Sequence, residues 1–197
     1  MKGDVLSLVR GRHGHFAYES GHHGDLWFDL ETLCQRPDIL QPYAAQLAAR
    51  LKPYLPDAVC GPLVEGAFIG LLVASELPCD FTYASRFAPS FSHAFFPIEY
   101  RLPPALYPLV SGKRVAIVND VISAGSAVRG ALRDLQSHGA IVVAVASLVM
   151  LGDAFADFAA QQKIPVESLA HLPNNLWTPA ECPLCAAGMA LEHLAIS

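Results

Sequence analysis

Residues 114–130 read RVAIVNDVISAGSAVRG, and this stretch decides the fold class. The apolar run from Val115 to Val118 predicts a buried strand over residues 114–119. Asn119 and Asp120 stand at the carboxyl end of that strand, and a short loop of small residues follows. A helix is expected next, over residues 125–138. Its apolar positions, which recur at helical spacing, are Ala127, Val128, Ala131, Leu132 and Leu135.

This strand, loop and helix suit a bound sugar phosphate. The N–H groups of the loop and the hydroxyls of Ser123 and Ser126 converge on the start of the helix, where negative charge is stabilised. Asp120 is placed to accept hydrogen bonds from ribose hydroxyls, and Gly125 lets the backbone approach closely. A polar loop between a strand and a helix occurs in every doubly wound fold, so only the complete string is specific.

Outward from this stretch, strands and helices alternate along the chain. Strands are expected over residues 57–61, 80–85, 114–119 and 141–151, and helices over residues 38–55, 65–76, 125–138 and 154–162. Residues 14–30 predict a hairpin around Ser20-Gly21, residues 86–112 a long loop or hairpin, and residues 164–197 a mixed tail. The order predicts an α/β fold, a doubly wound and mostly parallel sheet with helices on both faces. Ligands of such sheets bind at the carboxyl ends of the strands.

Length and composition are those of one globular domain. Of the 197 residues, 53% are hydrophobic and 16% are charged, the opposite of the balance in disordered chains. The longest apolar stretch, residues 140–151, is shorter than the about 20 residues of a membrane span, and the N-terminus shows no apolar signal segment. We therefore expect a cytoplasmic location and no membrane. The net charge of −5 without a basic run argues against nucleic acid, and five cysteines argue against a disulfide framework.

The complete string 114–130 resembles the phosphoribosyl-pyrophosphate signature of the type I phosphoribosyltransferases. That signature has four apolar residues, two acidic ones and a small loop of Thr/Ser-Ala-Gly-Thr/Ser form; here Asn119 replaces the first acid. The resemblance extends through most of the chain and is strongest to the orotate phosphoribosyltransferases. Their N-terminal G-x-F-x-L-x-S-G segment and aromatic pair resemble GHFAYESGHHGDLWFDL, residues 14–30, with Trp27-Phe28 as the pair.

The resemblance implies transfer of the 5-phosphoribosyl group from phosphoribosyl pyrophosphate to a nucleobase, with release of diphosphate, as in pyrimidine nucleotide biosynthesis. The implied catalytic residues are Asp120, Asn119 and Arg86. The implied contacts with phosphoribosyl pyrophosphate are Asn119, Asp120, Val121, Ile122, Ser123, Ala124, Gly125, Ser126, Ala127, Gly61, Pro62, Glu65 and Arg86. The implied contacts with the base are Trp27, Phe28 and Ser123, with Phe28 as the stacking residue; core packing is the alternative for one of the two aromatics.

Cofactor and architecture follow from the same resemblance. Magnesium is expected to be held mainly through the substrate diphosphate, and no metal site built from protein side chains is expected. A homodimer is expected because family members are usually dimers. The chain is expected to form one domain over residues 1–197, with an N-terminal hood over about residues 1–35 and a C-terminal extension over about residues 164–197.

Several positions depart from the orotate pattern. The family's orotate-contacting Lys and Arg correspond to Glu19 and to about Leu151, and residues 86–112 contain no lysine, leaving His93 and Arg101 as candidate cations. Loss of cations near an anionic base lowers affinity for it. Two alternatives to orotate transfer therefore stand. One is a phosphoribosyltransferase for a neutral base such as a purine, and the other is a non-catalytic regulator that binds phosphoribosyl pyrophosphate.

Two groups of metal-binding residue types remain. Cys182-Pro-Leu-Cys185 has the spacing of half a structural zinc site, but a second pair is missing from the sequence nearby, where only His171 and His193 flank it. The simpler interpretation is a C-terminal turn with two small apolar residues. The four N-terminal histidines are interpreted as polar surface or phosphate-facing residues; they are His13, His15, His22 and His23.

Overall fold

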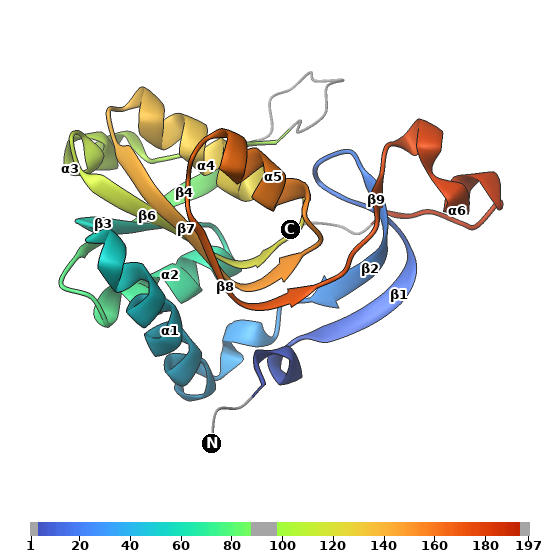
Figure 1. Cartoon of the computed structure of the whole chain (residues 1–197), viewed down its shortest axis with the longest axis horizontal. Helices are drawn as coiled ribbons and strands as arrows, with labels where there is room; N and C mark the ends of the chain where they lie inside the picture. Colours follow the sequence, from blue (N-terminus) through green and yellow to red (C-terminus); the bar gives the residue numbers. More distant parts are fainter. Residues whose placement is uncertain (1–3, 88–97, 194–197) are drawn as a thin grey trace.

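A six-stranded sheet forms the centre of the computed structural model, which describes residues 4–87 and 98–193. Its strand order is β5-β4-β3-β6-β7-β8 (Figure 1). The strands are β3 (Ala58–Pro62), β4 (Asp80–Phe87), β5 (Glu99–Arg101), β6 (Arg114–Ile122), β7 (Ile141–Leu151) and β8 (Val166–Leu172). All neighbouring strands are parallel except β5, which pairs antiparallel with β4 at the edge. The predicted mostly parallel α/β sheet is confirmed.

Helices cover both faces of this sheet. The pair α1 (Pro37–Leu51) and α2 (Glu65–Ser75) packs on one face, and the pair α4 (Ser126–Ser137) and α5 (Ala154–Gln161) packs on the other (Figure 1). The sequence of β6 reflects this cover on both faces. Val115 and Ile117 lie in the core with α4, while Ala116 and Val118 lie in the core with α1 and α2. A strand that is buried on both faces needs an unbroken apolar run. No helix in the described ranges combines the length and the apolar character that a bilayer crossing needs.

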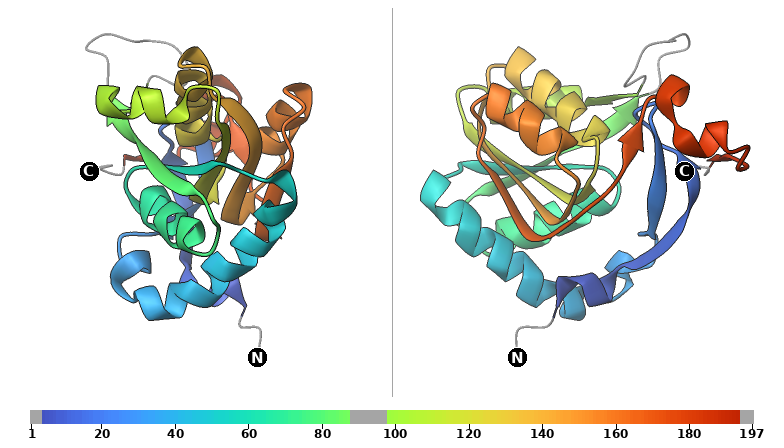
Figure 2. Two further views of the ribbon diagram at one scale, coloured as in Figure 1. Left: turned by 90° about the vertical axis from the view of Figure 1, so that its left-hand side faces the viewer. Right: turned by 45° about the vertical axis from the view of Figure 1, so that its right-hand side comes forward.

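The hood is a second, smaller sheet beside the main one. Its hairpin consists of β1 (Arg10–Ala17) and β2 (His23–Asp29), as predicted around Ser20-Gly21. Two short strands from the end of the chain complete it: β9 (Leu176–Trp177) pairs with β2, and β10 (Glu192–His193) pairs with β1. The hairpin and the C-terminal segment therefore lie side by side, away from the helices that cover the main sheet (Figure 2). We call residues 173–193 the C-terminal segment.

Some boundaries differ from those expected. The tail beginning at residue 164 is not all extension, because β8 is the edge strand of the main sheet and only the C-terminal segment leaves it. Within residues 86–112, the described part contains β5 and the short helix α3 (Tyr107–Val110); His93 lies outside the described residues. The remaining short helices are α6 (Pro183–Ala186) and five 3-10 turns, Val5–Leu8, Leu33–Gln35, Lys52–Tyr54, Pro104–Leu106 and Pro179–Glu181.

Candidate phosphoribosyl site

A cavity of about 500 Å³ lies where the carboxyl ends of β3, β4 and β6 meet the hood. Most of the residues expected at the site line it. They are Trp27, Phe28, Pro62, Glu65, Arg86, Asn119, Asp120, Val121, Ser123, Ala124, Gly125, Ser126 and Ala127. Gly61 and Ile122 do not line it. Ile122 is buried in the core beside α4, and Gly61 is packed under α2, so their expected substrate contacts do not match their positions.

Asp120 is the buried carboxylate of the site. It has 7% of its surface exposed, and burial raises its pKa to about 7, with the charge of Glu65 adding to the rise. Asn119 beside it donates from Nδ2 to the carbonyl of Val121 at 2.9 Å, which fixes its side chain. A Cβ on Gly66 would lie 2.1 Å from Asn119 Oδ1, so the start of α2 touches this amide only because residue 66 is glycine. A carboxylate so enclosed is suited to a ligand that brings hydroxyl groups or a cation.

The loop after Asp120 ends at the N-terminus of α4. Gly125 has a φ of 81°, which favours glycine, and a Cβ there would lie 2.2 Å from the ring of Phe155. The first N–H groups of a helix have no carbonyl partner within the helix, so those that begin at Ser126 face the cavity as donors. Arg129 holds the loop from behind, because its Nε donates to the carbonyl of Ala124 at 2.9 Å.

A second loop follows β3 and begins α2. Pro62 to Gly66 line the cavity, and this loop contains a cis peptide bond between Leu63 and Val64. A Cβ on Gly61 would lie 2.4 Å from the Cα of Ala67. Gly61 thus permits the close packing of strand against helix that brings the loop to the cavity, and its contribution to the site is structural.

Arg86 is the one Arg or Lys among the described residues that line the cavity. Its Nε lies 3.8 Å from Oε2 of Glu19, a hood residue that also accepts a hydrogen bond from the Tyr100 hydroxyl at 3.3 Å. Burial raises the pKa of Glu19, and Arg86 and Tyr100 act against that rise. The second carboxylate oxygen of Glu19 is buried and has no hydrogen-bond partner within the described residues.

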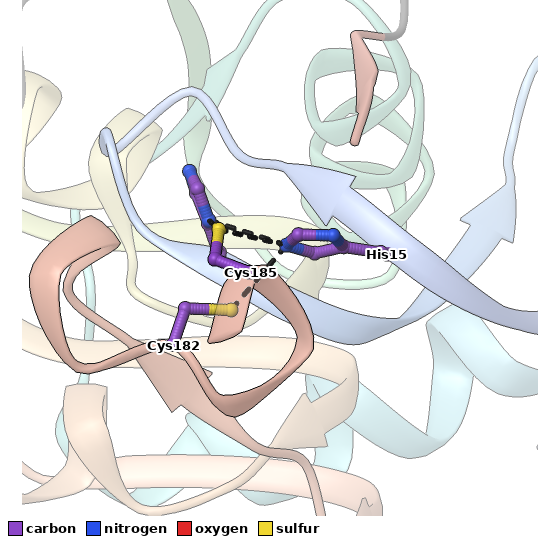
Figure 3. Close-up of side chains that lie close together, drawn as sticks. His15, Cys182 and Cys185 are labelled. Carbon is purple, nitrogen blue, oxygen red and sulfur yellow. Dashed lines mark hydrogen bonds between the residues drawn. The ribbon is translucent and has the colours of Figure 1, made fainter. Parts of the chain in front are cut away.

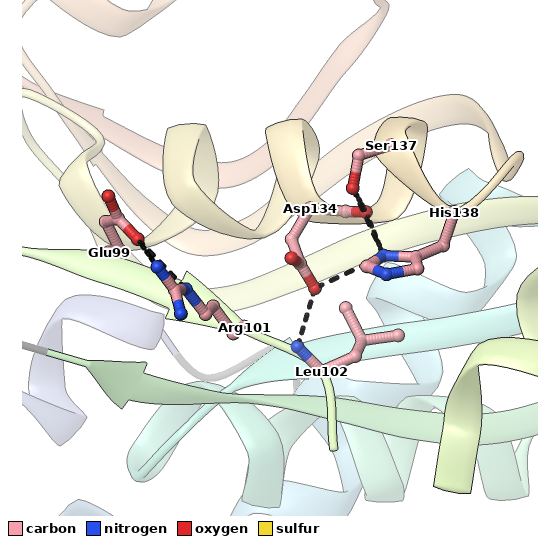
Figure 4. A network of polar contacts seen from close by, with 6 residues as sticks. All are labelled: Glu99, Arg101, Leu102, Asp134, Ser137 and His138. Atoms are coloured by element: carbon pink, nitrogen blue, oxygen red, sulfur yellow. Dashed lines mark hydrogen bonds and ion pairs between the residues drawn. The ribbon is translucent and has the colours of Figure 1, made fainter. Parts of the chain in front are cut away.

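Tyr100 reaches the cavity because β5 is fastened to α4. The Leu102 amide donates to Asp134 Oδ2 at 2.7 Å, and His138 lies 3.7 Å from the same carboxylate (Figure 4). Arg101, a candidate cation from the sequence, pairs instead with Glu99 at 2.6 Å and does not line the cavity. Leu151 is buried in the core, so it offers no contact to a base.

The hood supplies the aromatic wall. Trp27 and Phe28 both line the cavity, as expected, although Phe28 also belongs to the core. Trp27 stacks on Tyr18 with ring centroids 6.1 Å apart and an angle of 21° between the planes. Such a wall offers flat apolar surface to a planar ring.

Several residues that touch the site were not assigned to it from the sequence, among them Tyr18, Tyr100 and Asn174. Asn174 belongs to the C-terminal segment, and its Nδ2 donates to Ser123 Oγ at 3.0 Å. Tyr18 was within reach of the sequence, because it lies in the quoted hairpin next to Glu19. The sequence around Tyr100 and Asn174 gives no such signal. Each belongs to a segment without a regular spacing of apolar residues, and each meets the site only through tertiary packing.

Comparison with known proteins identifies relatives of the whole chain. No protein-family profile matches the chain. The chain is 28% identical to an orotate phosphoribosyltransferase of Caldanaerobacter subterraneus over 90% of its own length and 86% of the relative's. It is 29% identical to an orotate phosphoribosyltransferase of Thermotoga maritima, over 91% of its own length and 88% of the relative's.

Solved structures give the same fold. A Mycobacterium tuberculosis orotate phosphoribosyltransferase superposes with a TM-score of 0.63 at 19% identity, covering 86% of this chain and 97% of that one. An adenine phosphoribosyltransferase from Thermoanaerobacter pseudethanolicus gives the same TM-score and identity, covering 85% of this chain and 98% of that one. The chain therefore has the fold of the type I phosphoribosyltransferases, and its sequence resembles the orotate phosphoribosyltransferases over about 90% of its length.

Proposed function

We propose that the protein transfers the 5-phosphoribosyl group from phosphoribosyl pyrophosphate to a ring nitrogen of a nucleobase, releasing diphosphate. One observation carries the proposal. The carboxyl end of β6, the N-terminus of α4 and Arg86 surround a single cavity that the aromatic hood closes from the other side. The walls of this cavity offer chemically matching groups to each part of the reactants: a phosphate, a ribose, a diphosphate and a flat base.

The 5′-phosphate is assigned to the loop from Ser123 to Ala127. Its backbone donors and the hydroxyls of Ser123 and Ser126 stabilise an anion at the start of α4 without requiring a lysine. Asn174 fixes the hydroxyl of Ser123 from the C-terminal segment. The ribose hydroxyls then fall to Asp120 and Asn119.

The diphosphate is assigned to the loop from Pro62 to Gly66 and to Arg86, whose forked guanidinium fits phosphate oxygens. Asp120 and Glu65 offer the oxygen ligands that magnesium prefers, so the residues present fit this ion. Magnesium bound to the diphosphate neutralises charge on the leaving group. The ionised Asp120 carboxylate would in turn stabilise positive charge that develops on the ribose, and no covalent nucleophile is required.

The base is assigned to the hood. Orotate is the acceptor that the names of the curated relatives suggest. A neutral base is the second candidate, and Glu19 favours it. Its unpartnered buried oxygen can accept a hydrogen bond from a base N–H, whereas it would repel the carboxylate of orotate.

The test is magnesium-dependent release of diphosphate, measured with orotate, uracil, adenine, guanine and hypoxanthine in turn. Turnover with one base, abolished by Asp120→Asn and kept by the exposed control Asp153→Asn, supports the proposal. Binding of phosphoribosyl pyrophosphate without turnover on any base would contradict the proposed enzyme activity and would favour a non-catalytic regulator.

We also propose that a second copy of this chain is a partner of the protein. Three large apolar side chains, Val64 just before α2 and Phe68 and Leu71 within it, are 45–51% exposed and recur at the spacing of one helix face. The homodimer expected from the family resemblance would cover this stripe.

A further inference from the structure

Four residues of metal-binding type meet behind the hood, outside the cavity described above. His15 comes from β1 and His23 from β2, while Cys182 directly precedes α6 and Cys185 lies within it. One possible ligand atom from each lies within 4.8 Å of the other three. Figure 3 shows the His15 ring directed from its strand toward the sulfur atoms of Cys182 and Cys185.

Four of the six separations between these ligand atoms are close to the edges of a tetrahedron around zinc. Zn–N bonds of about 2.0–2.1 Å and Zn–S bonds of about 2.3 Å require ligand separations of roughly 3.4 Å between nitrogens and roughly 3.6 Å between nitrogen and sulfur. Nε2 of His15 lies 3.2 Å from Nδ1 of His23 and 3.3 Å from Sγ of Cys182. Sγ of Cys185 lies 3.6 Å from the same Nε2 and 3.2 Å from His23 Nδ1.

Hydrogen bonds alone do not account for this arrangement. Nδ1 of His15 lies 3.0 Å from the carbonyl of Met189, which can only accept, so Nδ1 carries the proton. In the neutral ring, Nε2 then has one lone pair, yet three polar atoms crowd around it. One bound cation uses that lone pair and the three neighbouring groups at once. A carbonyl behind a ligating histidine is also the usual support of a metal site.

Burial and chain geometry indicate what such an ion does. His15 is 1% exposed and Cys182 is 3% exposed, while Cys185 is exposed and leaves a path for entry. Cys182 is the one buried residue of the C-terminal segment, which therefore has almost no apolar core of its own. Small segments of this kind are commonly held by a structural metal.

We propose that His15, His23, Cys182 and Cys185 bind one zinc ion that fastens the C-terminal segment to the hood. Two thiolates and two imidazoles in tetrahedral array are the donor set of a structural zinc site. The ion keeps β9 and β10 on the edges of the hairpin. Through them it steadies Tyr18 and Glu19, which follow His15 in the chain and line the cavity.

Only the Cys182 and Cys185 half of this site could be recognised in the sequence. No protein-bound metal was expected because the C-x-x-C pair lacked partners nearby, where His171 and His193 were the candidates. His171 is bonded instead to the carbonyl of Gly152. The two histidines of the proposed site are about 160–170 residues away from the cysteines in the chain, and an irregularity in the β1–β2 register between His13 and Phe16 sets where His15 points.

The direct test is metal content of the whole chain, purified without chelator and measured by mass spectrometry. We expect one zinc per chain in the wild type, and loss of stoichiometric zinc in Cys182→Ser, Cys185→Ser and His15→Asn. The controls are His13→Asn, an exposed histidine of the same strand, and Cys79→Ser, a cysteine far from the cluster; both should keep the metal. A metal-free wild type that stays metal-free with added zinc, or ligand variants that keep one zinc, would overturn the proposal.

A second measurement covers variants that fail to fold. In the folded wild type, Co²⁺ added to the chelator-treated chain should give the absorption bands of a tetrahedral site with thiolate ligands. Zinc should also protect Cys182 and Cys185, but not Cys34, from alkylation. Octahedral cobalt spectra, or alkylation of Cys185 at the same rate with and without zinc, would contradict the site. Neither readout involves phosphoribosyl pyrophosphate, so the proposed reaction and the zinc site can fail separately.

Discussion

Asp120 shows at the scale of one residue how burial tunes the site. It is enclosed near the end of β6, and burial raises its pKa from 3.8 to about 7. The ligand-free site therefore carries a carboxyl group that takes up a proton near neutral pH. A bound cation would favour its ionised form, so ligand binding and proton release are linked.

This carboxyl group predicts a pH dependence of stability. Between about pH 4 and pH 7, Asp120 keeps its proton in the folded state but has lost it in the unfolded state. The stability that this proton contributes to the folded state is therefore full below about pH 4 and is lost as pH rises through 7. The wild type should lose stability relative to Asp120→Asn over this range, by up to about 1.4 kcal/mol per pH unit. Urea unfolding of both proteins from pH 5 to pH 8, without ligand, measures the difference. A difference that stays constant with pH would be inconsistent with the raised pKa.

Gly125 predicts a second effect at this scale. Gly125→Ala introduces both an unfavourable φ, about 1–2 kcal/mol, and an overlap with Phe155 that adds about 1–3 kcal/mol. Gly112→Ala is the matched control, because Gly112 has a φ of 72° and open space where its Cβ would be. Denaturant unfolding should show the greater loss for Gly125→Ala. Equal losses would mean that Phe155 moves aside freely.

In the proposed reaction, the hood is the element that would select the base. Glu19→Gln keeps the shape of the side chain and removes its charge. If a neutral base donates to Glu19, kcat/KM for that base should fall about 10- to 100-fold, since hydrogen bonds to charged groups contribute about 1.5–3 kcal/mol, while kcat/KM for orotate should rise. Glu31→Gln, a second carboxylate lining the cavity, is the control. A fall for orotate would instead assign Glu19 to orotate binding.

The elements also show how far sequence reasoning reaches. The strand, loop and helix from Arg114 to Ser137 were predictable because the apolar run, the polar strand end and the helical stripe are all local. The register of β8 could not be predicted, because residues 164–172 have no regular spacing of apolar residues and become a strand only beside β7. The roles of Asn174 and of the pair His15 and Cys182 depend on contacts across most of the chain, which no local pattern encodes.

In the molecule as a whole, the two sheets meet at the cavity, and the C-terminal segment pairs with the hairpin of the hood. The apolar stripe on α2 stands beside the loop from Pro62 to Gly66. A dimer through this stripe would place the partner next to the diphosphate end of the cavity. The covered face would then be continuous with the site.

This arrangement predicts that oligomeric state depends on α2. Phe68→Glu should convert a dimer into a monomer in sedimentation velocity or light scattering, because a charge would be buried against the partner's apolar surface. Ile141→Glu, at a residue that is 56% exposed on another part of the molecule, should leave the dimer intact. A monomeric wild type, or a dimer in both variants, would show that this stripe is not the interface.

Calorimetric titration of the purified protein with phosphoribosyl pyrophosphate and magnesium, repeated with Asp120→Ala, tests whether the cavity binds the proposed substrate. We predict binding to the wild type and a loss of about 100-fold or more in the variant, because hydrogen bonds to a charged group contribute about 1.5–3 kcal/mol each. Absence of binding to a wild type that circular dichroism shows to be folded would contradict the account and leave only the fold.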